Sequence, residues 1–217
     1  MKRDLVKLNK KLENESPEKI IQWGLKNSRN PILTTNFRPY EAAIIHLCIE
    51  IKPDIKIIWC DTGYNTQATY IHAQKLILEH NLNIEIYTPK YTREYLNALM
   101  GGIPGVGDKS HSDFTKYVKL EPFNRAISEI NPDLWITNLR IGQTNFRDSI
   151  NILSEGVNNL LKISPFYNWK DKDLDLYMSK NKLENEFDYF DPTKVENNRE
   201  CGLHKWLGKK AKKKVEF

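Results

Sequence analysis

The residues best suited to chemistry in this sequence surround Cys201, in the run RECGLH at positions 199–204. A cationic neighbour such as Arg199 lowers the pKa of a thiol and so raises its thiolate fraction. His204 follows three residues later, and a cysteine with a nearby histidine is suited to nucleophilic chemistry. The spacing fits a nucleophile delivered to a bound substrate, but it fits an exposed thiol without a role equally well.

The remaining cysteines and histidines do not suggest a metal site. Cys48 and Cys60 lie in apolar runs that are typical of a protein core. There is no Cys-x-x-Cys pair, and Cys201 with His204 supplies only two ligands, so zinc is a poor alternative. We expect the four other histidines to be structural or on the surface: His46, His72, His80 and His111.

Several cations and hydroxyls are candidates for binding an anion. Arg140 and Arg147 flank a Gly-Gln-Thr run after a predicted strand, and guanidinium groups bind phosphate and sulfate through paired hydrogen bonds. Lys119 could add a further cation. By themselves these charges are more typical of a surface loop.

Two turns after predicted strands could hold a nucleotide. The first is formed by Thr34, Thr35, Asn36, Phe37 and Arg38, and it precedes a predicted helix whose free N–H groups could bind an anion. The second is formed by Asp61, Thr62 and Gly63. The first lacks the glycines of a Walker loop or a dinucleotide fingerprint, and the second is weak evidence by itself. A separate stretch that is rich in glycine, residues 101–107, is interpreted as a flexible loop or lid over a phosphate site.

The elements that must position these residues alternate in type along the chain. Apolar runs predict strands at 31–35, 55–60, 84–87, 133–137 and 161–163. Helices are expected at 17–27, 39–51, 66–81, 121–130 and 170–178. This order predicts an α/β fold with a parallel sheet, in which ligands bind beyond the carboxyl ends of the strands.

The organisation expected is one domain and a tail. Residues 1–180 form the α/β domain, with a helical lead-in at 1–28, and residues 181–217 form a mobile segment that carries Cys201. Residues 181–200 are polar and are expected to be irregular. Residues 205–217 hold six lysines and one glutamate, which accounts for the whole net charge of +5. We interpret this tail either as a solvated end or as a patch that attracts a nucleotide anion or an acidic partner.

Composition excludes several classes. Because residues 1–204 are formally neutral, a body that binds duplex nucleic acid is not expected. No apolar run is long enough for a membrane span, and no signal-peptide core follows the first residues. Three cysteines in 217 residues argue against a disulfide scaffold, so we expect a cytoplasmic protein.

In combination, these motifs resemble the phosphoadenosine phosphosulfate (PAPS) reductase family. The ECGLH run at 200–204 is similar to that family's C-terminal signature. The DTGY run at 61–64, the KLEPFNRA run at 119–126 and the arginine loop at 139–147 resemble further family motifs, in the family's order. Two positions of the arginine loop depart from the pattern, Ile141 and Gly142, and Arg38 could supply a substitute cation.

The resemblance implies a Rossmann-like fold of the adenine nucleotide α-hydrolase type and a definite reaction. The Cys201 thiolate would attack the sulfur of PAPS, form a thiosulfonate and release adenosine 3′,5′-bisphosphate; thioredoxin or glutaredoxin would then liberate sulfite. Arg199, His204 and the cations named above would assist, since the attack of a thiolate on an anion requires charge neutralisation. Relatives also imply a homodimer or a higher oligomer.

The sister branch that reduces adenosine phosphosulfate carries a [4Fe–4S] cluster held by cysteines. This sequence has neither a Cys-Cys pair nor a Cys-x-x-Cys, so no cluster is expected. Two alternatives remain open: an adenylating enzyme of the same fold, whose first loop would be Ser-Gly-Gly-x-Asp-Ser, and a nucleotide-binding protein without catalysis.

Overall fold

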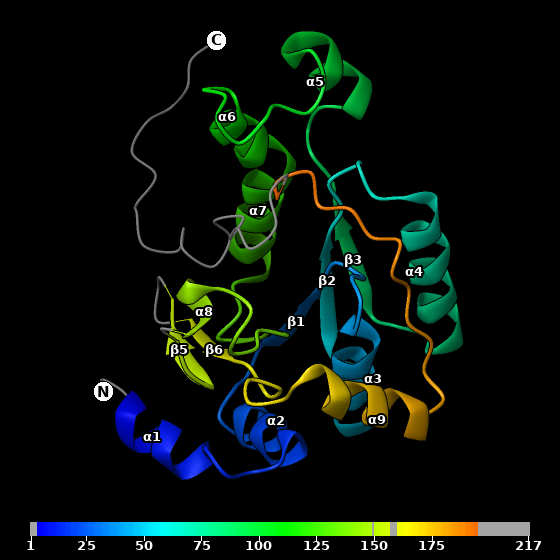
Figure 1. Ribbon diagram of the computed structural model, residues 1–217. Helices are drawn as coiled ribbons and strands as arrows, with labels where there is room; N and C mark the ends of the chain where they lie inside the picture. Colours follow the sequence, from blue (N-terminus) through cyan, green and yellow to red (C-terminus); the bar gives the residue numbers. More distant parts are fainter. Residues whose placement is uncertain (1–3, 149, 157–159, 195–217) are drawn as a thin grey trace.

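The computed structural model describes residues 4–148, 150–156 and 160–194. Its centre is a six-stranded sheet in the order β3-β2-β1-β4-β6-β5, flanked by helices (Figure 1). The strands are β1 (Pro31–Thr35), β2 (Lys56–Cys60), β3 (Ile84–Tyr87), β4 (Leu134–Ile136), β5 (Leu153–Glu155) and β6 (Leu161–Ile163). All neighbouring pairs are parallel except β5 with β6. The predicted α/β fold with a parallel sheet is therefore confirmed.

The helices lie on both faces of this sheet. They are α1 (Leu5–Leu12), α2 (Pro17–Lys26), α3 (Glu41–Ile51), α4 (Gln67–Glu79), α5 (Arg93–Met100), α6 (His111–Thr115), the π-helix η1 (Lys116–Leu120), α7 (Glu121–Ile130), α8 (Asn145–Asp148) and α9 (Asp171–Lys180). Helices α2, α3, α4 and α9 share one hydrophobic core with the sheet. Helix α7 packs on the opposite face through Phe123 and Ala126, against Trp135 of β4 and Ile58 of β2. Among the described helices, none is long and apolar enough to cross a bilayer.

The order of the strands locates a crevice. From β1 the chain builds outward through α3, β2, α4 and β3, and it then returns through α7 to β4 on the other side of β1. The connections therefore diverge between β1 and β4. At such a switch point the loops leave a crevice beyond the carboxyl ends of the strands, where α/β proteins bind ligands.

A π turn interrupts the long helical segment that runs from α6 into α7. Pro122 has no N–H to donate to the carbonyl four residues earlier, and the wider turn of η1 lies directly before it. The backbone N–H of Glu121 bonds to the carbonyl of Lys116, which is a π-type hydrogen bond. Lys119 lies in this turn and is buried. The sequence predicted a helix only from residue 121.

Asn9 of α1 closes one edge of the sheet. Its side-chain amide donates to the carbonyl of Leu153 at 3.0 Å and accepts from the Leu153 N–H at 2.8 Å. The amide thus bonds to β5 as one residue of a neighbouring strand would. The lead-in helix is consequently joined to the sheet.

Residues 183–194 form a segment that we call the strap. It contains no helix or strand, as expected, and it runs from α9 past α4 toward α7 (orange in Figure 1). Hydrogen bonds fix it to the body: the Asn185 amide oxygen accepts from the Tyr40 N–H at 2.9 Å, and the Asp188 carbonyl accepts from the Thr66 hydroxyl at 2.6 Å. The domain division at residue 180 and the mobility of the tail stay predictions.

Candidate active site

A pocket lies at the switch point between β1 and β4. It is lined by Thr34, Thr35, Asn36, Arg38, Glu41, Ile58, Cys60, Lys119, Phe123, Thr137, Leu139, Arg147, Asp191 and Lys194. Four of these side chains are cations and two are carboxylates, so the lining has a formal charge of +2. A concave site with a surplus of Arg and Lys is suited to binding an anion.

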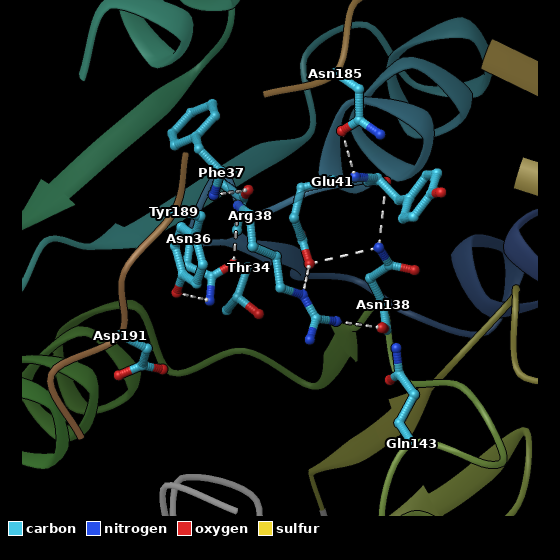
Figure 2. A network of polar contacts seen from close by, with 12 residues as sticks. Thr34, Asn36, Phe37, Arg38, Glu41, Asn138, Gln143, Asn185, Tyr189 and Asp191 are labelled. Atoms are coloured by element: carbon cyan, nitrogen blue, oxygen red, sulfur yellow. Dashed lines mark hydrogen bonds and ion pairs between the residues drawn. The ribbon is translucent and has the colours of Figure 1, made fainter. Parts of the chain in front are cut away.

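Arg38 is held in place by a buried carboxylate. Its Nε lies 2.9 Å from a carboxylate oxygen of Glu41, and one of its terminal nitrogens donates to the carbonyl of Asn138 at 2.8 Å (Figure 2). The Asn138 amide also donates to Glu41, at 3.4 Å. This network connects the loop after β1 to the loop after β4, so the guanidinium orientation depends on both loops.

Lys119 and Asp191 form a buried ion pair at the wall of the pocket. The Lys119 Nζ lies 2.5 Å from an Asp191 carboxylate oxygen, and the two side chains are 8% and 6% exposed. The other oxygen of Asp191 accepts from the backbone N–H and the hydroxyl of Thr193. Burial raises the pKa of Asp191, but Lys119 and Thr193 outweigh it, and the pKa is lowered overall. Asp191 is therefore charged at neutral pH.

The hydroxyl and amide groups at the end of β1 and in the loop after it are fixed by contacts on both sides. The Thr34 hydroxyl accepts from the indole N–H of Trp135 at 2.8 Å. The Thr35 hydroxyl accepts from the N–H of Phe37 at 3.1 Å. The Asn36 amide donates to the Tyr189 hydroxyl of the strap at 2.7 Å (Figure 2). The loop is thus held from the core below and from the strap above.

The two arginines of the 140–147 loop diverge. Arg147 is buried and lines the pocket, where its side chain bonds to the Gln143 amide oxygen. Arg140 instead pairs with Asp171 of α9 at 2.6 Å and lies over the Tyr40 ring, and it is not part of the pocket lining. The structure therefore brings Arg147, but not Arg140, together with Arg38 and Lys119.

Four further predicted binding residues do not line this pocket. The ring of Phe37 is 1% exposed and packs edge-on against Trp59 at a centroid distance of 4.8 Å. Asp61 accepts from the Gly63 N–H at 2.9 Å and from the Tyr70 hydroxyl at 2.9 Å, which shapes the turn after β2. Thr62 is buried, and its hydroxyl accepts from the N–H of Tyr64. Their role in binding stays a prediction, as does the lid interpretation of residues 101–107, none of which lines the pocket.

The two described cysteines are poor nucleophiles. Cys48 is fully buried, and burial raises the pKa of its thiol strongly. Cys60 is half-buried at the pocket wall; burial raises its pKa to about 12, although Lys119 and Arg125 act in the opposite direction. Both thiols remain protonated at neutral pH. The predicted catalytic residues Arg199, Cys201 and His204 lie outside the described residues.

Sequence reasoning missed Glu41 and Asp191 as site residues. Glu41 stands one turn after the first loop on a predicted helix, where a carboxylate looks like an ordinary surface residue. Asp191 precedes Pro192 and Thr193, a pattern that signals an Asx turn and could have marked a fixed point in the strap. Within the described ranges, no three His, Cys, Asp or Glu side chains are grouped closely enough to hold a metal ion.

The fold belongs to the adenine nucleotide α-hydrolase type. The solved PAPS reductase from Candida auris, in a phosphate complex, superposes with a TM-score of 0.74 at 23% identity, covering 85% of this chain and 89% of that one. A U34-tRNA thiolase from Methanococcus maripaludis superposes with a TM-score of 0.54 at 11% identity, over 88% and 68% of the two chains. These likenesses establish the architecture.

The family follows from sequence. The phosphoadenosine phosphosulfate reductase domain family matches residues 30–186, and the chain belongs to this family. A phosphoadenosine 5′-phosphosulfate reductase of Synechococcus is 31% identical over 183 residues, which cover 82% of this chain and 78% of the relative. One from Xylella fastidiosa is 33% identical over 181 residues, covering 83% and 76%. The resemblance read from the motifs is thereby confirmed.

Proposed function

We propose that this protein reduces PAPS to sulfite and adenosine 3′,5′-bisphosphate in sulfate assimilation, with Cys201 as the nucleophile. Membership of the family supports the reaction. The observation that carries the proposal within the structure is the cationic pocket at the switch point, where Arg38, Lys119 and Arg147 converge. A substrate with a phosphosulfate and a 3′-phosphate needs such a concentration of positive charge.

The reaction proceeds in two displacements. The Cys201 thiolate attacks the sulfur of the phosphosulfate, and the bond between that sulfur and the bridging oxygen breaks. Its electron pair leaves on the phosphate of adenosine 3′,5′-bisphosphate, and the enzyme carries a thiosulfonate. A thiolate of a reduced dithiol, thioredoxin or glutaredoxin, then attacks the Cys201 sulfur and expels sulfite. The second thiol resolves the mixed disulfide, so the two electrons come from the dithiol.

The pocket residues contribute binding and charge neutralisation to the first displacement. Arg38 and Arg147 offer planar donors to phosphate or sulfonate oxygens, and Lys119 offers a point charge. Arg199 would lower the pKa of Cys201, and His204 would stabilise the thiolate or protonate the leaving oxygen. The hydroxyls and amides at 34–36 and the turn at 61–63 complete the proposed binding surface, with Arg140 at its margin. No bound metal takes part.

A mass measurement tests the proposal. Incubation with PAPS in the absence of reductant should add one SO₃ group to Cys201, and Cys201→Ser should carry no adduct while it still binds adenosine 3′,5′-bisphosphate. Cys48→Ala serves as the control, because its thiol is buried in the core and should not affect the adduct. Sulfite production by Cys201→Ser would refute the assignment. Release of pyrophosphate from ATP would instead favour the adenylating alternative, and nucleotide binding without any adduct would favour a non-catalytic module.

The finer assignments are part of the same proposal. Thioredoxin and glutaredoxin are distinguished by the rate of sulfite release with each reductant at equal concentration. The mobile tail at 181–217, the homodimer and the cytoplasmic location are expected from the resemblance and the composition. A truncation after Leu207 tests whether the lysine-rich end affects KM for either substrate or its salt dependence.

A further inference from the structure

Asp191 occupies an unusual position for a carboxylate in a pocket suited to anions. Its side chain is buried, it lines the pocket, and one of its oxygens lies 2.5 Å from the Nζ of Lys119. A phosphate or sulfonate oxygen that approached Lys119 would compete for the same ammonium group. The carboxylate is thus an internal anion at a place where the proposed substrate would put one.

The attachment of Asp191 to the chain differs from that of the other pocket carboxylate. Glu41 lies in the first turn of α3, a regular helix of 11 residues that packs on the sheet. Asp191 lies in the strap, which has no regular secondary structure. Upstream of Asp191, the described strap bonds are made to α4 and to the loops beside β1 and α4, through Glu184, Asn185, Asp188 and Tyr189. A strap contact can be released locally, whereas a helix cannot shift without disturbing the core.

We propose that Asp191 is a displaceable counter-anion: an anionic ligand that binds Lys119 displaces the Asp191 carboxylate and thereby releases the end of the strap from the pocket. This inference rests on the proposed function for the identity of the ligand. It adds that the free protein neutralises its own binding cation with a residue of the strap. Ligand binding and the position of the strap are then thermodynamically coupled.

Titration calorimetry with adenosine 3′,5′-bisphosphate tests the displacement. Asp191→Asn removes the competing charge but keeps the shape, so the nucleotide should bind about 5-fold or more tightly than to the wild type, the lower end of typical coupling factors. The matched control is Glu184→Gln, which removes a carboxylate of the same strap that pairs with Lys75 on the surface. Its affinity should equal that of the wild type. Unchanged or weaker binding by Asp191→Asn, or equal tightening by Glu184→Gln, would overturn the proposal.

A second pair of variants assigns the effect to Lys119. Adding Asp191→Asn to Lys119→Met should produce no gain in affinity, because the cation that is competed for has been removed. A gain of the same size as in the wild-type background would contradict displacement from Lys119. If Asp191→Asn does not fold, hydrogen exchange on the wild type decides. The Thr193 N–H, which bonds to the Asp191 carboxylate, should exchange faster with nucleotide bound, and equal or slower exchange would refute release.

The design separates this inference from the proposed function, since neither readout depends on sulfite formation. Sulfite production with no effect of Asp191→Asn on affinity would refute the displacement alone. If adenosine 3′,5′-bisphosphate does not bind, the same titrations with inorganic phosphate test displacement by an anion directly. Tightening of phosphate by Asp191→Asn alone would support the displacement although the nucleotide assignment had failed, and phosphate binding that is absent or unchanged in both proteins would refute it.

Discussion

Replacing Glu41 with glutamine tests whether a buried carboxylate orients Arg38 in the pocket. The substitution keeps the size of the side chain and an oxygen that can accept from Arg38, but it removes the negative charge. The carboxylate lies 2.9 Å from the Arg38 Nε, with the two side chains 5% and 20% exposed. We expect lower stability, tighter binding of anions and slower turnover, because these three quantities depend on different consequences of the same charge.

The magnitude follows from the burial of the pair. Exposed ion pairs contribute under about 1 kcal/mol, whereas removing one partner of a fully buried pair costs about 3–5 kcal/mol. The Glu41 pair is close to the buried limit, but glutamine retains part of the hydrogen bond, so we expect a loss of about 2 kcal/mol in the free energy of unfolding. For a chain of this size, that loss corresponds to a decrease in Tm of roughly 4–8 °C.

The kinetic effect should separate kcat from KM. Without the anchor at Nε, Arg38 keeps the Asn138 carbonyl but loses its fixed orientation, and a loss of 1–2 kcal/mol in transition-state stabilisation lowers kcat by roughly 5- to 30-fold. KM should fall, because the pocket gains one unit of positive charge. Steady-state assays of sulfite release measure both constants, and Glu85→Gln, which breaks the surface pair with Lys56, should change neither. A Glu41→Gln protein with wild-type Tm, kcat and KM would refute the positioning role.

Two further substitutions test the packing and the electrostatics of the sheet. A Cβ at Gly24 would lie 2.7 Å from the Ile163 Cδ1, so Gly24→Ala should overpack the core. The penalty of about 1 kcal/mol, net of the higher helix propensity of alanine, should lower Tm by roughly 2–4 °C. Gly107→Ala is the control and should leave Tm unchanged, because its Cβ would have no atom within 4 Å. Burial lowers the pKa of Lys162, so the folded protein loses this proton at a lower pH than the unfolded chain does. Stability to urea should therefore rise as pH increases from the lowered pKa of the folded protein to the pKa of the unfolded chain, about 10.4. Lys162→Met should abolish this rise, and at pH 7 it should be more stable to urea than the wild type. If the wild type and Lys162→Met show the same dependence of stability on alkaline pH, Lys162 is hydrated in the folded protein.

Most of the sheet could be predicted from sequence because its strands are short apolar runs that alternate with helices. The runs at 31–35 and 84–87 match β1 and β3 to the residue. Helix α5 was missed although Thr92 caps its start and Gly101 its end, since its eight residues bury only Leu96 and give a weak periodic signal. Strand β5 is three residues long and antiparallel, which the pattern of alternating strands and helices does not anticipate.

The location of the site could be predicted from the sequence, but the ion pairs between its carboxylates and its cations could not. Parallel strands necessarily bring the loop after β1 and the loop after β4 to one edge of the sheet, so the grouping of Arg38 with Arg147 follows from topology. Which carboxylate pairs with which cation does not follow, because Lys119 and Asp191 are 72 residues apart and meet only through the π turn and the path of the strap. Arg140 shows the same limit: its pairing with Asp171 depends on where α9 docks.

The bonds between Asn9 and Leu153 bear on aggregation. An exposed edge strand offers unpaired N–H and carbonyl groups to any other strand, and such edges are common sites of intermolecular β-pairing. At the β5 edge one N–H and one carbonyl of the strand are already taken by the Asn9 amide, and α1 packs beside them. Removal of α1, or a substitution such as Asn9→Leu, would therefore leave the N–H and the carbonyl of Leu153 unpaired and favour pairing of this edge with another strand. Helix α1 thus covers an edge of the sheet that would otherwise be open to pairing with a strand of another molecule.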